Sequence, residues 1–394
     1  MTTRTATGQS TQADTREATS EAFATALAAL GGPPDWCLVF AGPDRDLSVI
    51  DEVLHEEAPR ALVQGCHTAG EFTERGLSHG AVALMLLSSD ELLIGGVTAS
   101  GARADPLGVA QALAAPWEDL SSRAGARGLG AATSVLLVDG LAGGGDRIVK
   151  EYQGLTRVFQ QIVGGAAGDE GRFHTTGVLG PGGVTADGAS VTQVFGKQPW
   201  GAGAAHGLEP ASKQLTVTKA KGSRLMEIDG KPAFEAYVAH AASKGITLTE
   251  ENRGRYLIGN EIGVFVLDTL HHARAPVGVE PDGSLKLVAD ISEGARICIL
   301  DGRPDAMVEA CSQAARQARS SLKGRRAAGV LVFDCVCRGM ILGAVGFERE
   351  IDAVRRVFPG TPVLGFLTYG EIARFGGRLD GWHNTTSVVA AIPA

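Results

Sequence analysis

The sequence predicts an α/β fold in which repeated strand–loop–helix–strand units form mixed sheets covered by helices. Short apolar runs that favour strands alternate with stretches whose apolar residues recur every three or four positions, as in an amphipathic helix. The same order of segments occurs three times along the chain. Glycine occurs 54 times in 394 residues, about twice its ordinary frequency, and falls in turns between the apolar segments.

Each unit begins with a strand, continues through a loop and a helix, and ends with a second strand and a glycine-rich turn. These four segments are 36–40, 47–54, 61–63 and 65–71 in the first unit, 135–138, 148–159, 162–163 and 164–169 in the second, and 330–333, 351–358, 363–364 and 365–371 in the third. Further strands are expected at 82–87, 92–97, 191–195 and 386–392. Each unit should contribute a βαβ element to a parallel or mixed sheet. The sequence leaves open whether the units close around a pseudo-threefold axis or lie side by side.

The stretch between the second and third units has a different rhythm. Strands are expected at 215–220, 226–228, 263–267, 277–279, 285–288 and 295–300, and helices from 232 to 241 and from 307 to 322. Asp229-Gly230 and Pro281–Gly283 are typical turn sequences between such strands. A boundary is expected near 196–207, where the apolar rhythm stops.

Composition excludes several classes of protein. The formal net charge is −8 and lysine and arginine are not clustered, which argues against a nucleic-acid-binding protein. No apolar run approaches the roughly 18 residues of a membrane span, so no membrane insertion is expected. The amino-terminal residues lack the apolar core of a secretory signal, which predicts a cytoplasmic protein. The six cysteines are scattered and fit small buried hydrophobes better than a zinc site or disulfides.

The glycine-rich turns carry the polar residues that we predict to bind a ligand. Ligands of α/β sheets gather at the carboxyl ends of strands, where free backbone N–H groups bind anions and carboxylates pair with ammonium groups. A zwitterionic ligand would suit both. The predicted ligand-binding residues are Gly65, Cys66, Thr68, Glu71, Asp169, Thr368, Tyr369 and Glu371. The alternative is that these threonines and carboxylates cap neighbouring backbone as ordinary turn residues.

Catalysis is left open, and no catalytic residue is predicted. Cys66 would need a distant histidine as its base, because adjacent residues on a strand point to opposite sides. Cys335 and Cys337 could serve as thiolates or simply pack in the core. The segment 139–147 opens a helix and could cradle phosphate, but it lacks the lysine and serine of a P-loop, and Asp146 is predicted to be the helix N-cap.

Four motifs in this order resemble the FIST family of bacterial ligand-sensing domains. The turn 65–71 (GCHTAGE) is similar to the N-terminal module of that family, and 164–169 (GGAAGD) to a later signature of the same module. The segments 364–372 (LGFLTYGEI) and 383–386 (HNTT) are similar to the end of the C-terminal module. The chain is therefore expected to hold a disordered lead-in over 1–20, a FIST N-terminal module over 21–207 and a FIST C-terminal module over 208–394.

The resemblance implies a sensory protein that binds a small, amino-acid-like ligand between its two modules. Closure of the modules around the ligand would then change the affinity for an output partner. Because the chain is expected to carry no kinase or receiver segment, the resemblance implies a separate partner such as a histidine kinase. Whether the protein forms a homodimer stays open, as does the identity of the ligand.

The resemblance also implies an alternative, because some members look like haem proteins that sense nitric oxide. Under this alternative the chain would sense nitric oxide or carry out haem-dependent chemistry, with His383 as the axial ligand of the iron. Phe347, Phe358, Phe366 and Phe375 would supply apolar walls. The competing interpretation of His383 is a hydrogen-bonded structural histidine.

Overall fold

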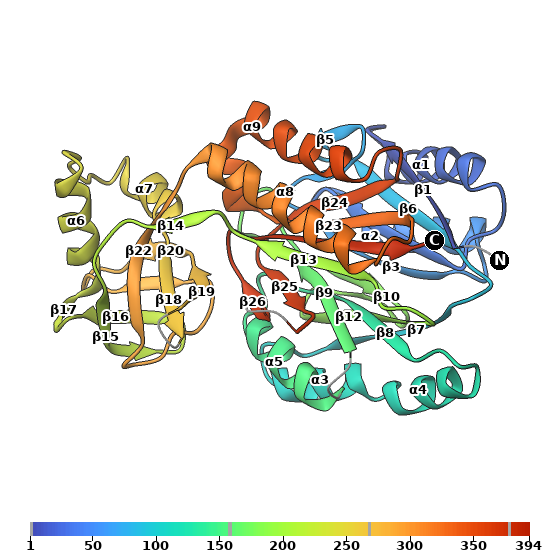
Figure 1. Ribbon diagram of the computed structural model, residues 1–394, viewed down its shortest axis with the longest axis horizontal. Helices are drawn as coiled ribbons and strands as arrows, with labels where there is room; N and C mark the ends of the chain where they lie inside the picture. Colours follow the sequence, from blue (N-terminus) through green and yellow to red (C-terminus); the bar gives the residue numbers. More distant parts are fainter. Residues whose placement is uncertain (1–2, 157–159, 267–268, 377–379) are drawn as a thin grey trace.

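The computed structural model describes residues 3–156, 160–266, 269–376 and 380–394. Figure 1 shows a large body of sheets with helices outside them on the right and a smaller subdomain on the left. The two ends of the chain lie together on the body. The body is built from three six-stranded sheets, and the subdomain has a fourth sheet.

The three sheets of the body share one topology. The first has the order β1 (Arg4–Ser10), β6 (Val82–Ser88), β2 (Trp36–Ala41), β3 (Leu62–His67), β10 (Val178–Gly180), β11 (Gly183–Thr185). The second has the order β7 (Leu93–Ser100), β12 (Gly188–Gly196), β8 (Ala131–Val138), β9 (Gln160–Ala166), β25 (Glu371–Arg374), β26 (Gly381–His383). The third has the order β13 (Gly201–Ala205), β27 (Ser387–Pro393), β23 (Ala327–Cys335), β24 (Val363–Thr368), β4 (Glu71–Thr73), β5 (Gly76–Ser78). In each sheet only the third and fourth strands are parallel, so the three predicted βαβ units are confirmed.

The last two strands of every sheet come from a different unit. Hairpin β10–β11 of the second unit completes the first sheet, β25–β26 of the third unit completes the second, and β4–β5 of the first unit completes the third. The three units therefore close into a ring, which answers the question that the sequence left open. The exchanged hairpins join the N-terminal and C-terminal halves of the body. Rigid closure of the two modules around a ligand would have to break these ladders.

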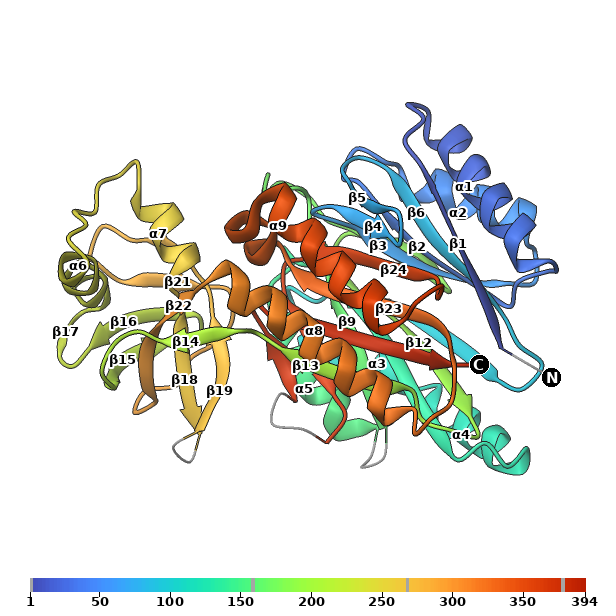
Figure 2. The same cartoon turned by 45° about the horizontal axis from the view of Figure 1, so that its top comes forward.

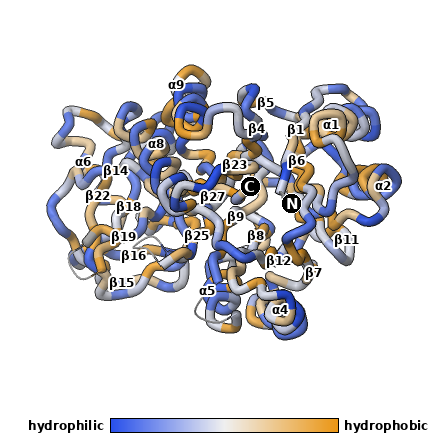
Figure 3. The backbone as a smooth tube through the Cα atoms, turned by 45° about the vertical axis from the view of Figure 1, so that its right-hand side comes forward, coloured by the Kyte–Doolittle hydropathy of each residue, from blue (hydrophilic) through white to orange (hydrophobic). Residues whose placement is uncertain are grey.

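Helices cover the outer faces of the sheets. The first sheet carries α1 (Thr15–Leu30) and α2 (Leu47–Glu57), the second α3 (Pro106–Ala114), α4 (Trp117–Ala126) and α5 (Gly145–Leu155), and the third α8 (Pro304–Ser321) and α9 (Val336–Val357). Hydrophobic and hydrophilic residues alternate along helices such as α2 and α4 (Figure 3). No helix in the described ranges is long and apolar enough to cross a membrane.

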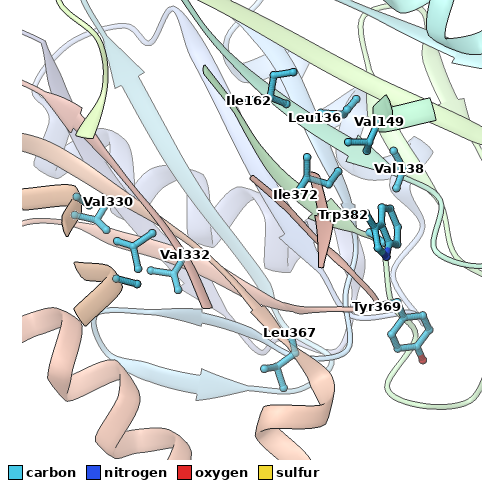
Figure 4. Close-up of a cluster of buried hydrophobic side chains, with 14 of the residues drawn as sticks. Leu136, Val138, Val149, Ile162, Val330, Val332, Leu367, Tyr369, Ile372 and Trp382 are labelled. Atoms are coloured by element: carbon cyan, nitrogen blue, oxygen red, sulfur yellow. The ribbon is translucent and has the colours of Figure 1, made fainter. Parts of the chain in front are cut away.

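The sheets bury apolar side chains from more than one unit in shared cores. Between the sheets, the Phe40 ring of the first unit lies 4.4 Å from Phe366 and 6.4 Å from Phe333 of the third, measured between centroids. Figure 4 shows a second core, in which Ile372 and Trp382 of the third unit's hairpin pack with side chains of β8, β9 and α5. The exchanged hairpins therefore contribute to the cores as well as to the ladders.

The subdomain interrupts the third unit between β13 and α8 (Figure 2). It contains α6 (Ala233–Ser243) and α7 (Arg253–Gly259) and the antiparallel strands β14 (Leu208–Pro210), β15 (Leu215–Lys221), β16 (Arg224–Ile228), β17 (Lys231–Pro232), β18 (Ile262–Val266), β19 (Thr269–Arg274), β20 (Pro276–Val279), β21 (Leu285–Leu287) and β22 (Arg296–Gly302). The third unit thus begins at β13, whose first residue, Gly201, lies within the range 196–207 where a boundary was expected. Residue 267 of an expected strand and 157–159 of an expected helix lie outside the described residues.

We expected a disordered lead-in over 1–20, but its described part contains strand β1 (Arg4–Ser10) and the first residues of α1, which begins at Thr15. Strand β1 pairs with β6 over its whole length, and α1 packs against it. A Cβ atom at Gly8 would lie 1.8 Å from the carbonyl oxygen of Ala22, so glycine lets the helix approach. The side chain of Asp14 caps α1 by accepting a hydrogen bond from the Glu17 N–H.

Candidate functional site

The three glycine-rich turns meet where the units interlock. Each turn donates one backbone hydrogen bond to the next, and the three bonds form a closed cycle. They run from Gly168 N to His67 O (3.0 Å), from Ala69 N to Leu367 O (3.0 Å) and from Tyr369 N to Ala166 O (3.1 Å). The predicted site residues of different units are thus brought together at one end of the parallel strands.

Gly65 and Cys66 serve the structure of β3. A Cβ atom at Gly65 would lie 2.3 Å from the Val39 carbonyl oxygen of the parallel neighbour, and the matching glycines Gly164 and Gly365 are crowded in the same way. Cys66 is fully buried, and burial raises the pKa of its thiol well above the usual value. A thiol in this state does not favour nucleophilic chemistry.

Glu71 and Glu371 occupy equivalent positions and make the same hydrogen bonds. Glu71 accepts hydrogen bonds from Thr68 Oγ1 (2.6 Å) and from the Ala81 N–H at the start of the returning strand. Glu371 accepts from Thr368 Oγ1 and from the Thr386 N–H (2.9 Å). Both glutamates are fully buried. The two pairs therefore hold each turn to the next strand by hydrogen bonds. This is the alternative given above, in which the threonines and carboxylates cap neighbouring backbone as turn residues.

The second unit departs from the other two by an inserted loop. In the first and third units, the carbonyl oxygens of Gly70 and Gly370 accept a backbone hydrogen bond from the neighbouring turn. In the second unit the Gly177 carbonyl oxygen accepts the equivalent bond, so residues 169–176 are an insertion. Asp169 fastens this loop by accepting hydrogen bonds from the Phe173, His174 and Thr175 N–H groups and from the Tyr369 hydroxyl.

The predicted residues Asp169 and Tyr369 therefore meet. Burial opposes the charge of Asp169, but the Tyr369 hydroxyl and the backbone donors hold the pKa of this carboxyl below its usual value. The ring of Phe173, which is 61% exposed, stacks on Tyr369 with a centroid distance of 5.1 Å.

Asp139 is a candidate binding residue that sequence reasoning missed. It is 3% exposed, and its Oδ1 accepts hydrogen bonds from the N–H groups of Leu141 (2.8 Å) and Ala142 (3.2 Å) and from Thr176 Oγ1. Its Oδ2 is buried and has no hydrogen-bond partner among the described residues. Burial raises the pKa of Asp139, although its hydrogen bonds and the charge of Arg103 oppose this. Its position directly after the apolar run 135–138 was the available signal.

His67 lies beside this carboxylate. Its Nε2 is 2.8 Å from the Arg45 carbonyl oxygen, while its buried Nδ1 has no hydrogen-bond partner among the described residues. Burial lowers the pKa of His67, and the nearby Asp139 carboxylate partly offsets this effect. The neutral histidine can therefore offer a second unpaired polar atom near Asp139.

A pocket of about 370 Å³ is lined in part by Leu141 and Thr176, which both donate hydrogen bonds to Asp139. Its lining residues come from the turn before α3, the loop before α5, the inserted loop and the connection from β11 to β12. They are Arg103, Leu141, His174, Thr175, Thr176, Thr185, Ala186 and Asp187. Arg103 and Asp187 have a long ion pair of 4.0 Å, and the Arg103 side chain is 62% exposed. The pocket thus has a guanidinium at its side and, behind Thr176 and Leu141, a buried carboxylate.

The 139–147 segment does not form the phosphate cradle that we considered. Asp139 Oδ1 already accepts the N–H groups of Leu141 and Ala142, which a phosphate would need. The predicted N-cap was wrong, because the N-cap of α5 is Gly144 in the left-handed conformation (φ 71°). Asp146 lies inside the first turn and accepts a hydrogen bond from the Asp290 N–H of the subdomain at 3.3 Å.

His383 lies at the contact between the body and the subdomain. It is fully buried, and its Nδ1 is 3.4 Å from His272 Nδ1. The predicted haem walls are not assembled around it, since Phe347 packs on Phe72 at 5.4 Å and Phe366 packs between the sheets. Phe347 and Phe366 therefore serve the cores and not the surroundings of His383.

A buried ionic cluster lies under α9. The Arg338 guanidinium is within 2.9 Å of the Asp334 carboxylate and also contacts Glu350, and all three side chains are at most 1% exposed. Cys311 lies near both carboxylates. Because the guanidinium already lies between the acids, the cluster needs no metal for neutralisation. Cys335 and Cys337 are buried next to this region, and burial raises the pKa of Cys335 well above normal, which favours the packing interpretation.

Comparison with known proteins agrees with this ring of related units. The FIST N domain family matches residues 35–231, and the FIST C domain family matches residues 233–374. The uncharacterized protein MJ1623 of Methanocaldococcus jannaschii is 38% identical over 77 residues, which are 20% of this chain and 15% of that protein. The uncharacterized protein Mb0898c of Mycobacterium bovis is 26% identical over 199 residues, 47% of this chain and 48% of that protein. The chain thus matches about half or less of each relative's length.

A crystal structure of a chorismatase aligns with 100% of this chain and 99% of its own, at 8% identity and a TM-score of 0.34. A likeness of this size carries no argument about fold or chemistry. The two family matches together span residues 35–231 and 233–374, in the order that the sequence motifs predicted. The chain therefore belongs to the FIST family of small-ligand sensing domains.

Proposed function

We propose that this protein is a cytoplasmic sensor that binds a small, amino-acid-like ligand in the pocket beside Asp139 and signals to a separate partner. The observation that carries the proposal is the unpartnered, buried Oδ2 of Asp139, a residue bonded to Leu141 and Thr176 of a pocket that Arg103 also lines. This location replaces the Thr68–Glu71 and Thr368–Glu371 turns, whose carboxylates are already satisfied by hydrogen bonds.

The chemistry of the pocket suits a zwitterion. A buried carboxylate without a full set of partners is costly, and an ammonium group bound at Oδ2 would offset that cost. Arg103 can pair with a ligand carboxylate, because its interaction with Asp187 is long and exposed. The hydroxyl groups of Thr175 and Thr176 add polar atoms to the same pocket. His67 Nδ1 is a further unpartnered polar atom among the described residues, on a residue whose pKa Asp139 influences.

The inserted loop offers a route for the signal. His174 and Thr175 line the pocket, and the neighbouring Phe173 is 61% exposed and rests on Tyr369. A ligand that contacts His174 and Thr175 would change the position of Phe173 relative to the surface. A partner such as a histidine kinase would recognise that change, and no movement of the exchanged strands is needed.

The test is calorimetric titration with the standard amino acids, using Asp139→Asn and Arg103→Gln. Asparagine keeps an oxygen for the Leu141 and Ala142 N–H groups, so the fold should survive while the charge is lost. We expect at least about tenfold weaker binding for each variant, since each removes a charged hydrogen bond. Arg123→Gln, on the exposed face of α4, is the matched control and should bind as the wild type does. Unchanged affinity in Asp139→Asn would place the ligand elsewhere.

Haem binding through His383 and a homodimer stay predictions. Haem there would require the contact between His383 and His272 to open, because the His383 ring is fully buried. An optical spectrum of the purified protein with added haemin tests this alternative. A saturable Soret band that is lost in His383→Ala would support it, and a featureless spectrum would exclude it.

A further inference from the structure

We propose that the second unit holds another small-molecule site, in a groove at the break between α3 and α4. The geometry points to a neutral ligand with a flat apolar body and a single hydrogen-bond donor. This site is separate from the Asp139 pocket and does not depend on the function proposed for it. The two lie near opposite ends of α5, whose last residue, Leu155, lines the groove.

The groove exists because one helix of the repeat is broken. In the first and third units the corresponding helices α1 and α8 run without interruption for 16 and 18 residues. In the second unit α3 ends at Ala114 and α4 begins at Trp117, after Pro116. The resulting groove has a volume of about 670 Å³, within the usual range for small-molecule sites.

The walls are mainly apolar and include two aromatic rings. Trp117 and Phe195 lie 5.2 Å apart between centroids, and Leu129 and Leu155 add aliphatic surface. Leu155 is 43% exposed, so an apolar ligand would cover a side chain that otherwise faces water. Glu118 is the one charged residue among the described residues that line the groove, which favours a neutral ligand over an ion.

The floor is polar and incompletely paired. Gln160 lines the groove, is 4% exposed, and has an Oε1 atom without a partner among the described residues. Its amide nitrogen contacts Ser134 Oγ, and the Tyr152 hydroxyl contacts Ser134 Oγ at 2.9 Å and Gln193 Nε2 at 3.0 Å. A donor on a ligand would supply the bond that Gln160 Oε1 lacks.

The other two units act as an internal control for this polar floor. Position Ser134 faces Gln193 across the β8–β12 ladder. The equivalent pair is Cys37 and Leu86 in the first unit, and Val330 and Ala391 in the third. The ring therefore folds with apolar pairs at these positions in the first and third units, and the second unit, which has the broken helix, places a polar pair there. Packing alone does not require that network.

The experiment compares indole with benzofuran, which has the same shape but no N–H donor. Calorimetry or ligand-observed NMR with the full chain should show saturable binding of indole, and benzofuran should bind about tenfold more weakly for want of one hydrogen bond. Gln160→Leu should abolish that difference. Gln161→Leu, whose side chain bonds to the Trp200 carbonyl oxygen instead, should keep it.

A second variant keeps the test decisive if Gln160→Leu fails to fold. Ala115 is exposed and lines the groove, so Ala115→Phe should fill it without disturbing the core and should remove indole binding. Asp139→Asn should leave indole binding unchanged, which separates this site from the proposed sensor pocket. The proposal is overturned if neither probe binds, if both bind equally to the wild type, or if Ala115→Phe binds indole normally.

Discussion

Single residues show most clearly where sequence reasoning ends. The equivalence of Thr68–Glu71 and Thr368–Glu371 could be predicted from their spacing, and the structure places both pairs alike. The sequence could not predict that both carboxylates already have hydrogen-bond donors. The donors are the Ala81 and Thr386 N–H groups, which lie ten and fifteen residues further along the chain. Asp139 was hidden for a similar reason, since its unpaired oxygen depends on the inserted loop.

The buried glutamates predict a pH dependence of stability. Burial raises the pKa of Glu71 to about 8 in the folded chain, against 4.5 as its ordinary value, and Thr68 and Ala81 only partly oppose this. Above pH 4.5 the unfolded chain has lost a proton that the folded chain still holds. The contribution of this group is therefore fully present at low pH and is lost as the pH rises toward 8.

Glu71→Gln tests this directly. Glutamine can still accept from the Ala81 N–H and bond to Thr68, but it does not ionise. We expect the variant and the wild type to have similar unfolding free energies at pH 5, and the variant to be more stable at pH 9 by about 1–3 kcal/mol. Urea unfolding of the variant and the wild type at both pH values measures this difference. Glu57→Gln is the control, because Glu57 is exposed and its replacement should not change the pH dependence. Parallel pH profiles for wild type and Glu71→Gln would contradict the assignment.

At the scale of elements, apolar strands and amphipathic helices were predicted well, and polar edge strands were not. Strand β1 has the sequence RTATGQS, which carries no apolar alternation, yet it pairs with β6 over seven residues. Its partners come from far along the chain, as when the Thr7 hydroxyl donates to Glu74. Short hairpin strands such as β4 and β10 have only three residues, too few for a period to show.

Glycine substitutions test how closely these elements pack. Gly8→Ala should destabilise the protein by several kcal/mol or prevent folding, because its Cβ would meet the Ala22 carbonyl oxygen of α1. Gly125→Ala is the matched control, since Gly125 lies in α4 with open space around it. The control should be neutral or more stable by about 0.5–1 kcal/mol. Thermal unfolding compares the two, and a well-folded Gly8→Ala would show that β1 and α1 are not packed as described.

At the scale of the whole molecule, the threefold repeat was predictable and its closure was not. The periodic segments of each unit carry the repeat, whereas the closure depends on hairpins that leave their own unit and pair with another (Figures 1 and 2). The second and third units also differ from the common order of segments. The second has the loop 169–176 and the broken helix, and the third has the subdomain, so the candidate sites lie where the repeats differ.

The closed ring makes a prediction about the subdomain. Its two ends meet, because Leu208 and Gly302 are registered partners in antiparallel strands, which places their Cα atoms about 5 Å apart. Replacing residues 209–301 with a short glycine–serine turn should therefore leave all three body sheets intact. The cost is the loss of the contacts between the subdomain and the body, such as Glu261 with Thr385, His272 with His383 and Asp290 with Asp146 and Arg147.

We expect the shortened chain to unfold cooperatively at a lower temperature than the full chain, with retained near-ultraviolet circular dichroism. It should also retain the ligand affinity of the Asp139 pocket, since every residue lining that pocket belongs to the second unit. Loss of cooperative unfolding would mean that the subdomain is part of the ring's core. Loss of ligand binding in a folded ring would instead assign sensing to the contact between the subdomain and the body.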